Sequence, residues 1–451
     1  MQTRFDAAQL SDPGTAAAAG AIRNCVHCGF CTATCPTYVL LGDELDSPRG
    51  RIYLIKEMLE SSAAPSAAVV KHLDRCLSCL ACETHCPSGV SYRRIIDEGR
   101  AYVEQHHRRP LRERLLRSLL AAVLPHRGRL RAALALARLA RPFAARFEGS
   151  VTLRPLATLL RLDATAQTLR REHAQPPPGE RPEARSAPAS ASAPQTQTRA
   201  AGAIRVGVAG GCVEPVLDPE IQRATIRLLE RSGCEIVRPK HAGCCGALAH
   251  HMGREADSAQ AMRAQIDAWH AELEAGDLAA IVVTTSGCGP VMRDYAHLLR
   301  DDPAYAGKAA RISALVCDVT ELYQRIELPP RVPRPPAVVA YHAACSLQHG
   351  QKVVGAPASL LTLAGFTVRA PRDAHLCCGS AGVYNILQPE IAGRLGLRKA
   401  ASLDALRPDF IATGNIGCMV QIAGSSAIPV VHVAQLLDWA TGGPKPHARA
   451  P

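Results

Sequence analysis

The sequence lacks the features that would mark a membrane-spanning, secreted or nucleotide-binding chain. No apolar run approaches the roughly 20 residues that a membrane-spanning helix needs. The opening MQTRFDAAQL is mixed in charge and has neither the basic start nor the apolar run of a secretory signal, so we expect none. No GxGxxG motif follows a predicted strand. Aromatic residues make up only 4% of the 451 residues, which leaves no stacking platform for single-stranded nucleic acid.

The positive charge of the chain is concentrated in one stretch. The formal net charge is +12, yet the segment from Arg108 to Glu172 alone has 15 arginines, no lysine and four acidic residues. The rest of the chain is therefore nearly neutral. Because the sequence also has no recognised nucleic-acid-binding motif, we expect no nucleic acid partner. The alternative, a protein that binds DNA or RNA through these arginines, would show a strongly salt-dependent affinity.

Cysteine is abundant, with 18 residues. Without a secretory signal, so many thiols indicate metal ligands in a reducing compartment rather than disulfides. Two runs share the spacing Cys-x2-Cys-x2-Cys-x3-Cys-Pro, the first from Cys25 to Pro36 and the second from Cys76 to Pro87. This is the spacing of bacterial two-cluster ferredoxins, in which the fourth cysteine of each run ligates the cluster of the other run.

The spacing predicts two [4Fe-4S] clusters with exchanged fourth ligands. The predicted metal ligands are Cys25, Cys28, Cys31 and Cys86 for one cluster, and Cys76, Cys79, Cys82 and Cys35 for the other. Structural zinc is the alternative to iron and sulfide. It fits less well, because a zinc site built from CxxC pairs gives no role to a third cysteine at the same spacing or to a fourth before proline.

The segments beside the two runs have helical periodicity. Between them, IYLIKEMLE places apolar residues at helical spacing, which predicts a helical ferredoxin rather than the small β-rich kind. Arg49 and Arg51 come just before this helix. Two interpretations stay open for them: a solvated surface, or compensation for the negative charge of the clusters.

Residues 91–172 continue as amphipathic helices in which arginines interrupt the apolar runs. Here too, two interpretations stay open. One is a helical bundle with a basic outer face. The other is a basic face that docks on anionic lipid or on an acidic partner subunit. The next segment, rich in proline, alanine and serine, predicts a linker.

An internal repeat follows the linker. Each copy alternates strand-like and helical segments, and matching cysteines are offset by 133 residues, or by 130 at the last position. The repeat predicts two α/β domains related by pseudo-twofold symmetry, so the expected fold class is α + α/β, with an N-terminal α-helical ferredoxin domain. The predicted divisions are a flexible N-terminus at 1–20, the ferredoxin at 21–105, a basic amphipathic helical region at 106–172, the linker at 173–203, and α/β domains at 204–330 and 335–445.

Four cysteines in each copy come just after predicted strands, at the sheet edge where α/β folds build their sites. A cofactor-binding or redox role is predicted for Cys212, Cys244, Cys245 and Cys288 of the first copy, and for Cys345, Cys377, Cys378 and Cys418 of the second. Buried reduced cysteine is the alternative. Cys234 and Cys317 have no counterpart in the other copy and are expected to be ordinary residues.

Histidines accompany the repeat motifs, and imidazole ligates or tunes iron in some centres. They are His241, His250, His251, His342 and His375. For each taken singly, a hydrogen-bonded or exposed histidine is the expectation.

The tandem runs followed by two CCG repeats resemble the iron-sulfur subunit of glycolate dehydrogenase (glycolate oxidase). The resemblance covers roughly residues 20–105 and 204–440, and is closest in YHAACSLQHGQKV, LCCGSAGVYN and ATGNIGCMVQI. The wider group with cysteine-rich CCG domains includes subunits of heterodisulfide reductase, lactate-utilisation complexes and anaerobic glycerol-3-phosphate dehydrogenase.

The sequence departs from the wider group at one position in each copy. A full CCG motif there ends in CxxC and holds a non-cubane cluster, whereas Thr285 and Asn415 stand here at the first cysteine of that pair. Each copy thus offers four cysteines instead of five. A conventional cluster, a disulfide switch and no cofactor all stay open for the CCG domains.

The resemblance implies an electron-transfer subunit without catalytic residues of its own. Iron-sulfur centres move single electrons and do not oxidise an alcohol alone. FAD-containing dehydrogenase subunits would oxidise glycolate to glyoxylate, and electrons would pass through two [4Fe-4S] clusters, and through any further cluster in the CCG domains, to a quinone or other membrane acceptor. The expected location is cytoplasmic, with peripheral contact to the inner face of the membrane through the arginine-rich helices.

Two alternatives to the glycolate function stay open. One is the equivalent subunit of a lactate or anaerobic glycerol-3-phosphate dehydrogenase. The other is a catalytic subunit like that of heterodisulfide reductase, in which the CCG clusters perform the chemistry themselves. The missing fifth cysteine argues against its disulfide version.

Overall fold

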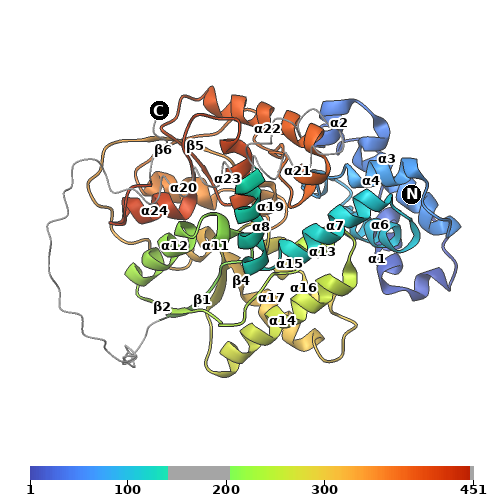
Figure 1. The fold of residues 1–451 in the computed structure, drawn as a ribbon, viewed down its shortest axis with the longest axis horizontal. Coiled ribbons are helices and arrows are strands. Elements are labelled where there is room, and N and C mark those ends of the chain that lie inside the picture. The colour runs from blue at the N-terminus through green and yellow to red at the C-terminus, as the bar shows by residue number, and fades with distance from the viewer. Residues whose placement is uncertain (141–203, 447–451) are drawn as a thin grey trace.

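The computed structural model describes residues 1–140 and 204–446 (Figure 1). A helical N-terminal part is followed by two α/β units, each built on a parallel sheet. The predicted linker, 173–203, and residues 141–172 of the predicted basic helical region lie outside the described residues. The α + α/β class expected from the sequence is confirmed.

The N-terminal part is a helical ferredoxin, as predicted, and no strand lies within residues 1–140. The helix expected between the two cysteine runs is α3 (Pro48–Ser61), which buries its periodic apolar residues, among them Ile52 and Ile55. Its neighbours are α1 (Pro13–Arg23), α2 (Pro36–Leu41), α4 (Ala67–Asp74), α5 (Ala81–Thr84) and α6 (Tyr92–His106). Short 3-10 helices lie at Gln9–Ser11 and Glu44–Asp46.

The first residues differ from the flexible lead-in that the sequence predicts for 1–20. Asp12 caps α1 by accepting a hydrogen bond from the Thr15 amide at 2.7 Å. Ala18 and Ala19 are fully buried, and α1 packs against α6. The alanine run therefore serves as a helix whose small side chains allow close packing.

The two α/β units have the same sheet topology. The first sheet has the order β2-β1-β3-β4 and the second β6-β5-β7-β8, with every pairing parallel. The strands are β1 (Ile204–Ala209), β2 (Cys234–Val237), β3 (Ala280–Val283), β4 (Val316–Asp318), β5 (Val338–Tyr341), β6 (Thr367–Arg369), β7 (Phe410–Thr413) and β8 (Val430–His432). The matching order confirms the predicted repeat of α/β units.

Helices alternate with the strands in both units, and those of the first unit come first along the chain. They are α11 (Glu214–Leu217), α12 (Glu220–Arg231), α13 (Ala247–His251), α14 (Glu255–Glu274), α15 (Gly289–Met292), α16 (Tyr295–Leu298), α17 (Ala306–Leu315) and α18 (Val319–Leu322). Those of the second are α19 (Cys345–Gln348), α20 (Ala356–Leu363), α21 (Tyr384–Leu387), α22 (Pro389–Asp404), α23 (Ile416–Ala423) and α24 (Val433–Ala440).

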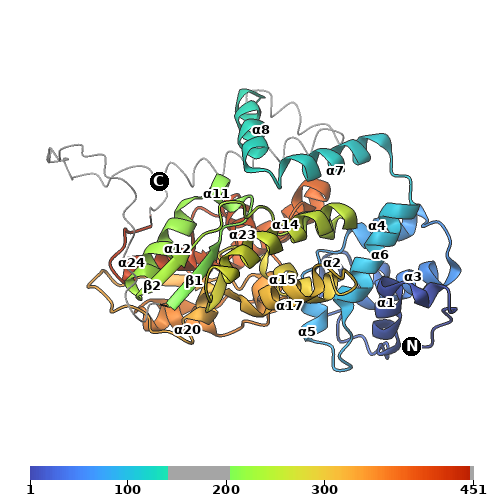
Figure 2. The ribbon, with the colours of Figure 1, turned by 90° about the horizontal axis from the view of Figure 1, so that it is seen from below.

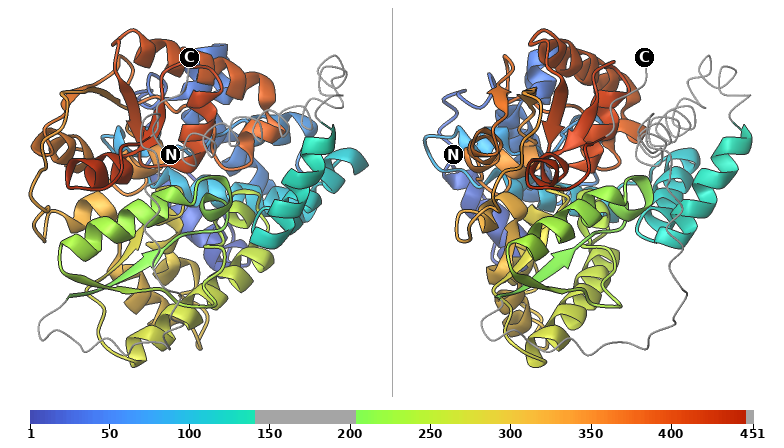
Figure 3. Two further views of the ribbon diagram at one scale, coloured as in Figure 1. Left: turned by 60° about the vertical axis from the view of Figure 1, so that its left-hand side comes forward. Right: turned by 90° about the vertical axis from the view of Figure 1, so that its left-hand side faces the viewer.

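The two α/β units lie side by side (Figure 3), and one hydrophobic core joins them. It contains residues of both sheets, including Val206 of β1 and Val339 of β5. Helices α12 and α24 pack side by side over it, and Asp438 of α24 pairs with Arg227 and Arg231 of α12. The shared core fixes the two sheets against each other, so sites at their carboxyl edges face a common space.

The described part of the basic region consists of α7 (Leu111–Val123) and α8 (Arg127–Ala140), which lie along one side of the α/β units (Figure 2). Leu120 of α7 is buried against Met252 of the first unit and against Val383 and Ile386 of the second. At the start of α8, the Arg127 guanidinium donates hydrogen bonds to the Gly211 carbonyl at 2.7 and 3.1 Å. One face of this helix pair therefore packs on both units.

A buried ionic cluster holds the helical part together. The Asp46 carboxylate is fully buried and lies 3.3 Å from the Arg51 guanidinium, 2.9 Å from His72 Nδ1 and 2.7 Å from Arg75. Arg51 is 1% exposed, and it also donates to the His72 carbonyl at 2.7 Å and to the Thr37 hydroxyl at 3.0 Å. A buried charge is tolerated only when it is paired and hydrogen-bonded, and each charge here has several partners.

Removal of the Asp46 carboxylate should destabilise the protein strongly. In Asp46→Ala, Arg51 stays buried without its counter-charge, which costs about 3–5 kcal/mol of unfolding free energy. The matched control is Glu44→Ala, because Glu44 is 46% exposed and its pair with Arg49 is worth about 0–1 kcal/mol. Thermal unfolding of the anaerobically purified chain should show a much larger fall in midpoint for Asp46→Ala. Equal falls would contradict this account.

Candidate metal centres

The structure brings together the four cysteines predicted to hold the first cluster. A small cavity of about 30 Å³ is lined by Cys25, Cys28 and Cys31 of the first run and by Cys86 of the second. Cys82 also reaches this cavity, so the two predicted centres are neighbours. The Val90 amide donates to Cys86 Sγ at 3.5 Å. Cys86 of the second run thus lies beside the cysteines of the first run, as the predicted exchange requires.

Two cysteines of the second predicted set, Cys35 and Cys76, lie near Arg51 in the first turn of α3. The Arg51 guanidinium approaches Cys35 Sγ at 3.8 Å, the Tyr92 hydroxyl lies 3.8 Å from Cys76 Sγ, and the Ser78 amide donates to Cys76 Sγ at 3.4 Å. Burial raises the pKa of the Cys79 and Cys82 thiols well above the usual value, and neighbouring thiols add to the rise. A bound cation would favour their deprotonated form.

The two arginines that precede α3 have different surroundings. Arg51 is buried beside Cys35 and Asp46, so it can compensate negative charge at the second set. Arg49 is 35% exposed, pairs with Glu44 at 2.6 Å and lines the first cavity. The charge-compensation interpretation is therefore favoured for Arg51, whereas Arg49 lies at the solvent edge.

A larger cavity of about 290 Å³ lies between the ferredoxin part and the two α/β units. All eight cysteines of the repeat line it, and so does Cys76 of the ferredoxin. Leu124, Leu130 and Leu134 of the α7–α8 pair close one side. The carboxyl edges of both sheets thus face one space, as parallel sheets with the same topology permit.

The vicinal pair of each copy is followed by a glycine that no other residue could replace without strain. Gly246 and Gly379 have φ of +86° and +89°, the left-handed region that favours glycine. A Cβ on Gly379 would also lie 2.6 Å from the Ala392 carbonyl oxygen, and one on Gly246 would lie 2.9 Å from that of Ser258. The glycine of each CCG motif therefore permits a tight backbone turn, and the two adjacent cysteines before it line the cavity.

In the first copy, a buried carboxyl group occupies the neighbourhood of the missing cysteine. Glu214 is 1% exposed and accepts hydrogen bonds from the Thr284 hydroxyl at 2.7 Å and the Thr285 hydroxyl at 2.5 Å. Burial raises the pKa of Glu214 to about 8. The thiols also interact, since a hydrogen bond with Cys212 lowers the pKa of Cys244. Thr285, at the position of the missing cysteine, thus donates its hydroxyl hydrogen bond to Glu214.

In the second copy, the sulfurs form two close pairs. Cys378 Sγ lies 3.2 Å from Cys418 Sγ, and Cys345 Sγ lies 3.7 Å from Cys377 Sγ. The Gly379 amide donates to Cys377 Sγ at 3.4 Å. Asn415, at the position of the missing cysteine, instead caps α23 by accepting from the Gly417 amide at 2.9 Å. Four sulfurs and one backbone donor therefore converge without the fifth cysteine.

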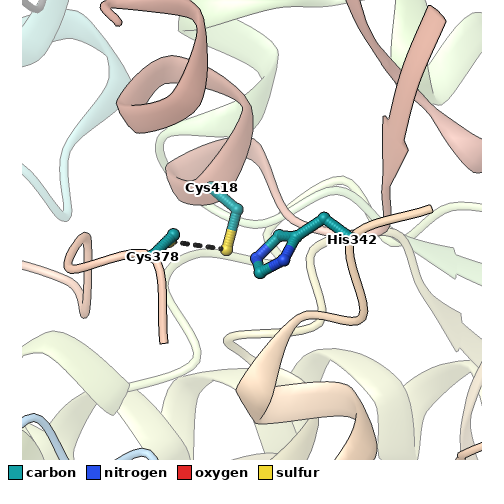
Figure 4. Close-up of side chains that lie close together, drawn as sticks. All are labelled: His342, Cys378 and Cys418. Atoms are coloured by element: carbon teal, nitrogen blue, oxygen red, sulfur yellow. Dashed lines mark hydrogen bonds between the residues drawn. The ribbon is translucent and has the colours of Figure 1, made fainter. Parts of the chain in front are cut away.

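The histidines named from the sequence have different environments. His241 is exposed and His375 is partly exposed. His250 pairs with Asp97 of the ferredoxin at 3.0 Å, beside His251. His342 alone of the five is fully buried, and it lies beside Cys378 and Cys418 (Figure 4).

Two buried residues of charged type near the repeat cysteines, Lys399 and Glu214, were not predicted from the sequence. Lys399 of α22 donates to the Asp373 carbonyl at 2.8 Å, and the nearby Cys378 and Cys377 oppose the fall in its pKa that burial causes. A signal was available, because Lys399 stands at helical spacing between Leu395 and Leu403, which are both buried. Glu214, two residues after Cys212, gave no such signal.

The ferredoxin part contacts the second α/β unit at its second cysteine run. Cys79 belongs to one hydrophobic cluster with Cys377 and Tyr384. The Tyr384 hydroxyl donates to the Arg75 carbonyl at 3.0 Å, and the Thr84 hydroxyl lies 2.7 Å from His349 Nδ1. The second set of ferredoxin cysteines therefore lies next to the cysteines of the second copy.

Comparison with protein-family models gives matches over all the cysteine motifs. Residues 24–90 match a 4Fe-4S dicluster domain, and residues 206–293 and 339–423 match a cysteine-rich domain. The dicluster domain indicates two [4Fe-4S] clusters, and the cysteine-rich domains indicate a further iron-sulfur site.

Similar proteins cover nearly the whole chain. The chain is 39% identical to the glycolate oxidase iron-sulfur subunit of Escherichia coli K12, over 98% of this chain and 99% of that protein. It is 31% identical to the probable glycolate oxidase iron-sulfur subunit of Bacillus subtilis 168, over 94% and 95%. A lactate utilization protein A from an Exiguobacterium strain is 27% identical over 50% of this chain. The chain therefore belongs to the family of glycolate oxidase iron-sulfur subunits.

Proposed function

We propose that this chain carries electrons, one at a time, from a flavin-dependent glycolate dehydrogenase to a membrane acceptor. The observation that carries the proposal is that Cys79 of the ferredoxin and Cys377 of the second α/β unit belong to one hydrophobic cluster, which makes two cysteine sites neighbours. Glycolate is proposed as the substrate because the relatives from Escherichia coli and Bacillus subtilis are named as glycolate oxidase subunits.

The proposed ligands follow the two runs and the repeat. The first cubane set and the repeat cysteines fit iron because their thiols line a cavity. In the second cubane set, Cys35, Cys76 and Cys79 all lie near Cys82, and the Ser78 amide donates to Cys76 Sγ. The first cubane is assigned to Cys25, Cys28, Cys31 and Cys86, the second to Cys76, Cys79, Cys82 and Cys35, and further cofactor binding to Cys212, Cys244, Cys245, Cys288, Cys345, Cys377, Cys378 and Cys418. When bound, such clusters accept and release single electrons.

The residues around the thiols set the environment in which electrons move. Backbone N–H groups that donate to sulfur, such as those of Ser78 and Gly379, stabilise negative charge and so tune a reduction potential. The buried Arg51 adds a fixed positive charge beside Cys35. Leu77 and Ile391 pack with Cys79 and exclude water from the contact between the two parts.

Substrate oxidation is assigned to FAD-containing partner subunits. In the proposed complex, this chain accepts the electrons that the reduced flavin releases. The domain division proposed for this role keeps 21–105 as the ferredoxin and 204–330 and 335–445 as the CCG domains. Lactate is the alternative substrate, because lactate utilization protein A resembles half of the chain.

Cys28→Ser should separate electron transfer from substrate chemistry. The variant should lose one cubane, about four of the eight irons that two cubanes hold. In the complex purified with its flavin subunits, glycolate should still reduce the flavin, as followed by stopped-flow absorbance, whereas reduction of a quinone analogue should stop. The control is Cys317→Ser, which removes a buried thiol of β4 outside the proposed ligand sets.

Failure of flavin reduction in Cys28→Ser would give this chain a role in substrate chemistry and contradict the proposal. Comparison of glycolate, lactate and glycerol 3-phosphate as reductants of the same complex tests the substrate. Faster flavin reduction by lactate or by glycerol 3-phosphate than by glycolate would reject the glycolate function while keeping the electron-transfer role.

The outer face of α7 and α8 is proposed to rest on anionic lipid at the inner face of the cytoplasmic membrane. Within the described residues, no helix is long and apolar enough to cross a membrane. The outer face nevertheless combines exposed leucines with arginines, a pattern typical of interfacial helices. Its exposed residues include Leu111, Leu115, Leu119, Leu136 and Leu139, and Arg114, Arg129 and Arg131.

Leu115→Glu/Leu119→Glu should abolish binding to anionic vesicles. The two leucines are 61% and 56% exposed, and burial of each in the interface contributes about 1.5–3 kcal/mol, so binding should fall more than tenfold. The matched control is Leu363→Glu/Leu397→Glu, whose leucines are 63% and 62% exposed on α20 and α22. Co-sedimentation of the full chain with phosphatidylglycerol vesicles, at low and high salt, measures the effect.

An equal loss of binding in both double variants would contradict the assignment of this face to lipid. A second contradicting result is a wild-type chain that does not bind vesicles, together with a Leu115→Glu/Leu119→Glu variant that no longer binds the flavin subunits. The face would then bind a protein.

A further inference from the structure

The side chain of His342 is buried, and among the described residues it has no hydrogen-bond partner. His342 follows β5 directly, and its backbone amide donates to the Ala412 carbonyl of β7 at 2.8 Å, which fixes its backbone at the carboxyl edge of the second sheet. Its side chain is 0% exposed, yet within the described residues neither Nδ1 nor Nε2 is hydrogen-bonded. Because buried polar groups are almost always paired, two unpaired nitrogens on one ring require an explanation.

The imidazole lies beside the sulfurs of the second copy. A ring nitrogen of His342, Cys378 Sγ and Cys418 Sγ all lie within 4.8 Å of one another. Figure 4 shows the ring turned toward the Cys418 sulfur, on the side away from Cys378. The three side chains come from the end of β5, the CCG turn and the start of α23, so three separate segments converge on one point.

The first copy has no equivalent of this histidine. The offset of 133 residues that relates the cysteines places Ala209 opposite His342. The two copies therefore differ at this position, although their glycine turns and vicinal thiols match. In the first copy, Glu214 and Thr285 pair with each other instead.

We infer that His342 is an iron ligand, through a ring nitrogen, of an iron-sulfur cluster that Cys345, Cys377, Cys378 and Cys418 hold in the second CCG domain. The imidazole supplies the fifth protein ligand that Asn415 does not. The inference rests on the proposed loading of the CCG cysteines, and it makes the two copies unequal, with mixed nitrogen and sulfur ligation in the second only.

Ligation explains one of the two unpaired ring nitrogens and the closeness of the ring to two thiols. A neutral imidazole offers one nitrogen lone pair to a metal, as in the iron-sulfur centres where histidine replaces cysteine. Replacement of a thiolate by a neutral ligand also removes one negative charge from a buried site, which lowers the cost of burial and raises the reduction potential.

The test uses the full chain purified anaerobically, with iron and sulfide analysis and pulsed EPR. A centre that takes up one electron has an odd electron count in one of its two redox states, so one state is visible. Labelling of histidine with ¹⁵N in the imidazole ring should change a strong nitrogen coupling in the wild-type signal. The variants are His342→Ala, His342→Cys and, as a matched control, His349→Asn, whose ring contacts the Thr84 hydroxyl instead.

The expected result is more than eight irons in the wild type, with a histidine nitrogen coupling that is lost in His342→Ala and kept in His349→Asn. His342→Cys should keep the iron, lose the coupling and titrate at a lower midpoint potential. If His342→Ala fails to fold, the nitrogen coupling in the labelled wild type, compared with His349→Asn and His342→Cys, tests the assignment.

Two results would overturn the inference in different ways. More than eight irons without a histidine coupling in the wild type would leave the CCG cluster in place and reject His342 as its ligand. Only eight irons in the wild type would reject the loading of the CCG cysteines, and the inference with it, while the dicluster role of the ferredoxin would stand.

Discussion

Thiols from distant parts of the chain come together at two cavities, and this convergence demands a rigid frame. The first cavity is lined by three cysteines of one run and by Cys82 and Cys86 of the other, and the larger cavity by the eight cysteines of the repeat and by Cys76. Such groupings persist only if the segments that carry them are fixed by other contacts. The buried Asp46 cluster performs this task within the ferredoxin, and the shared core of the two α/β units performs it at the sheet edges.

The placement of the ferredoxin then determines which sites are neighbours. Its second cysteine run packs against the second copy of the repeat, through Cys79, Cys377 and Tyr384. The first run, around Cys28, lines the smaller cavity on the ferredoxin itself. The arrangement gives the chain two ends, one at the first cubane site and one at the CCG cavity, with the second cubane site between them. An order of this kind suits a carrier that receives electrons at one end and delivers them at the other.

The sequence predicted what depends on spacing, and it missed what depends on packing. The helical ferredoxin and the repeated sheets follow from fixed intervals and periodicity, and both are present in the fold. The exchange of the fourth cysteines stays a prediction, supported by the position of Cys86 beside the first run. The ordered helix at Pro13–Arg23 was missed because a run of alanine has little hydrophobic signal until a partner helix covers it. The isolation of His342 was equally invisible, since the absence of a hydrogen-bond partner is a property of three-dimensional surroundings.

The most direct test of the account is the magnetic interaction between the CCG centre and the ferredoxin cubanes. EPR spectra of the full chain, poised at successive potentials, would show whether the signal of the CCG centre changes as the cubanes take up electrons. The signal should split or broaden, because the second cubane site and the second copy are in contact. This change should be absent in Cys377→Ser/Cys378→Ser. A CCG signal that stays unchanged while both cubanes become reduced would contradict the account.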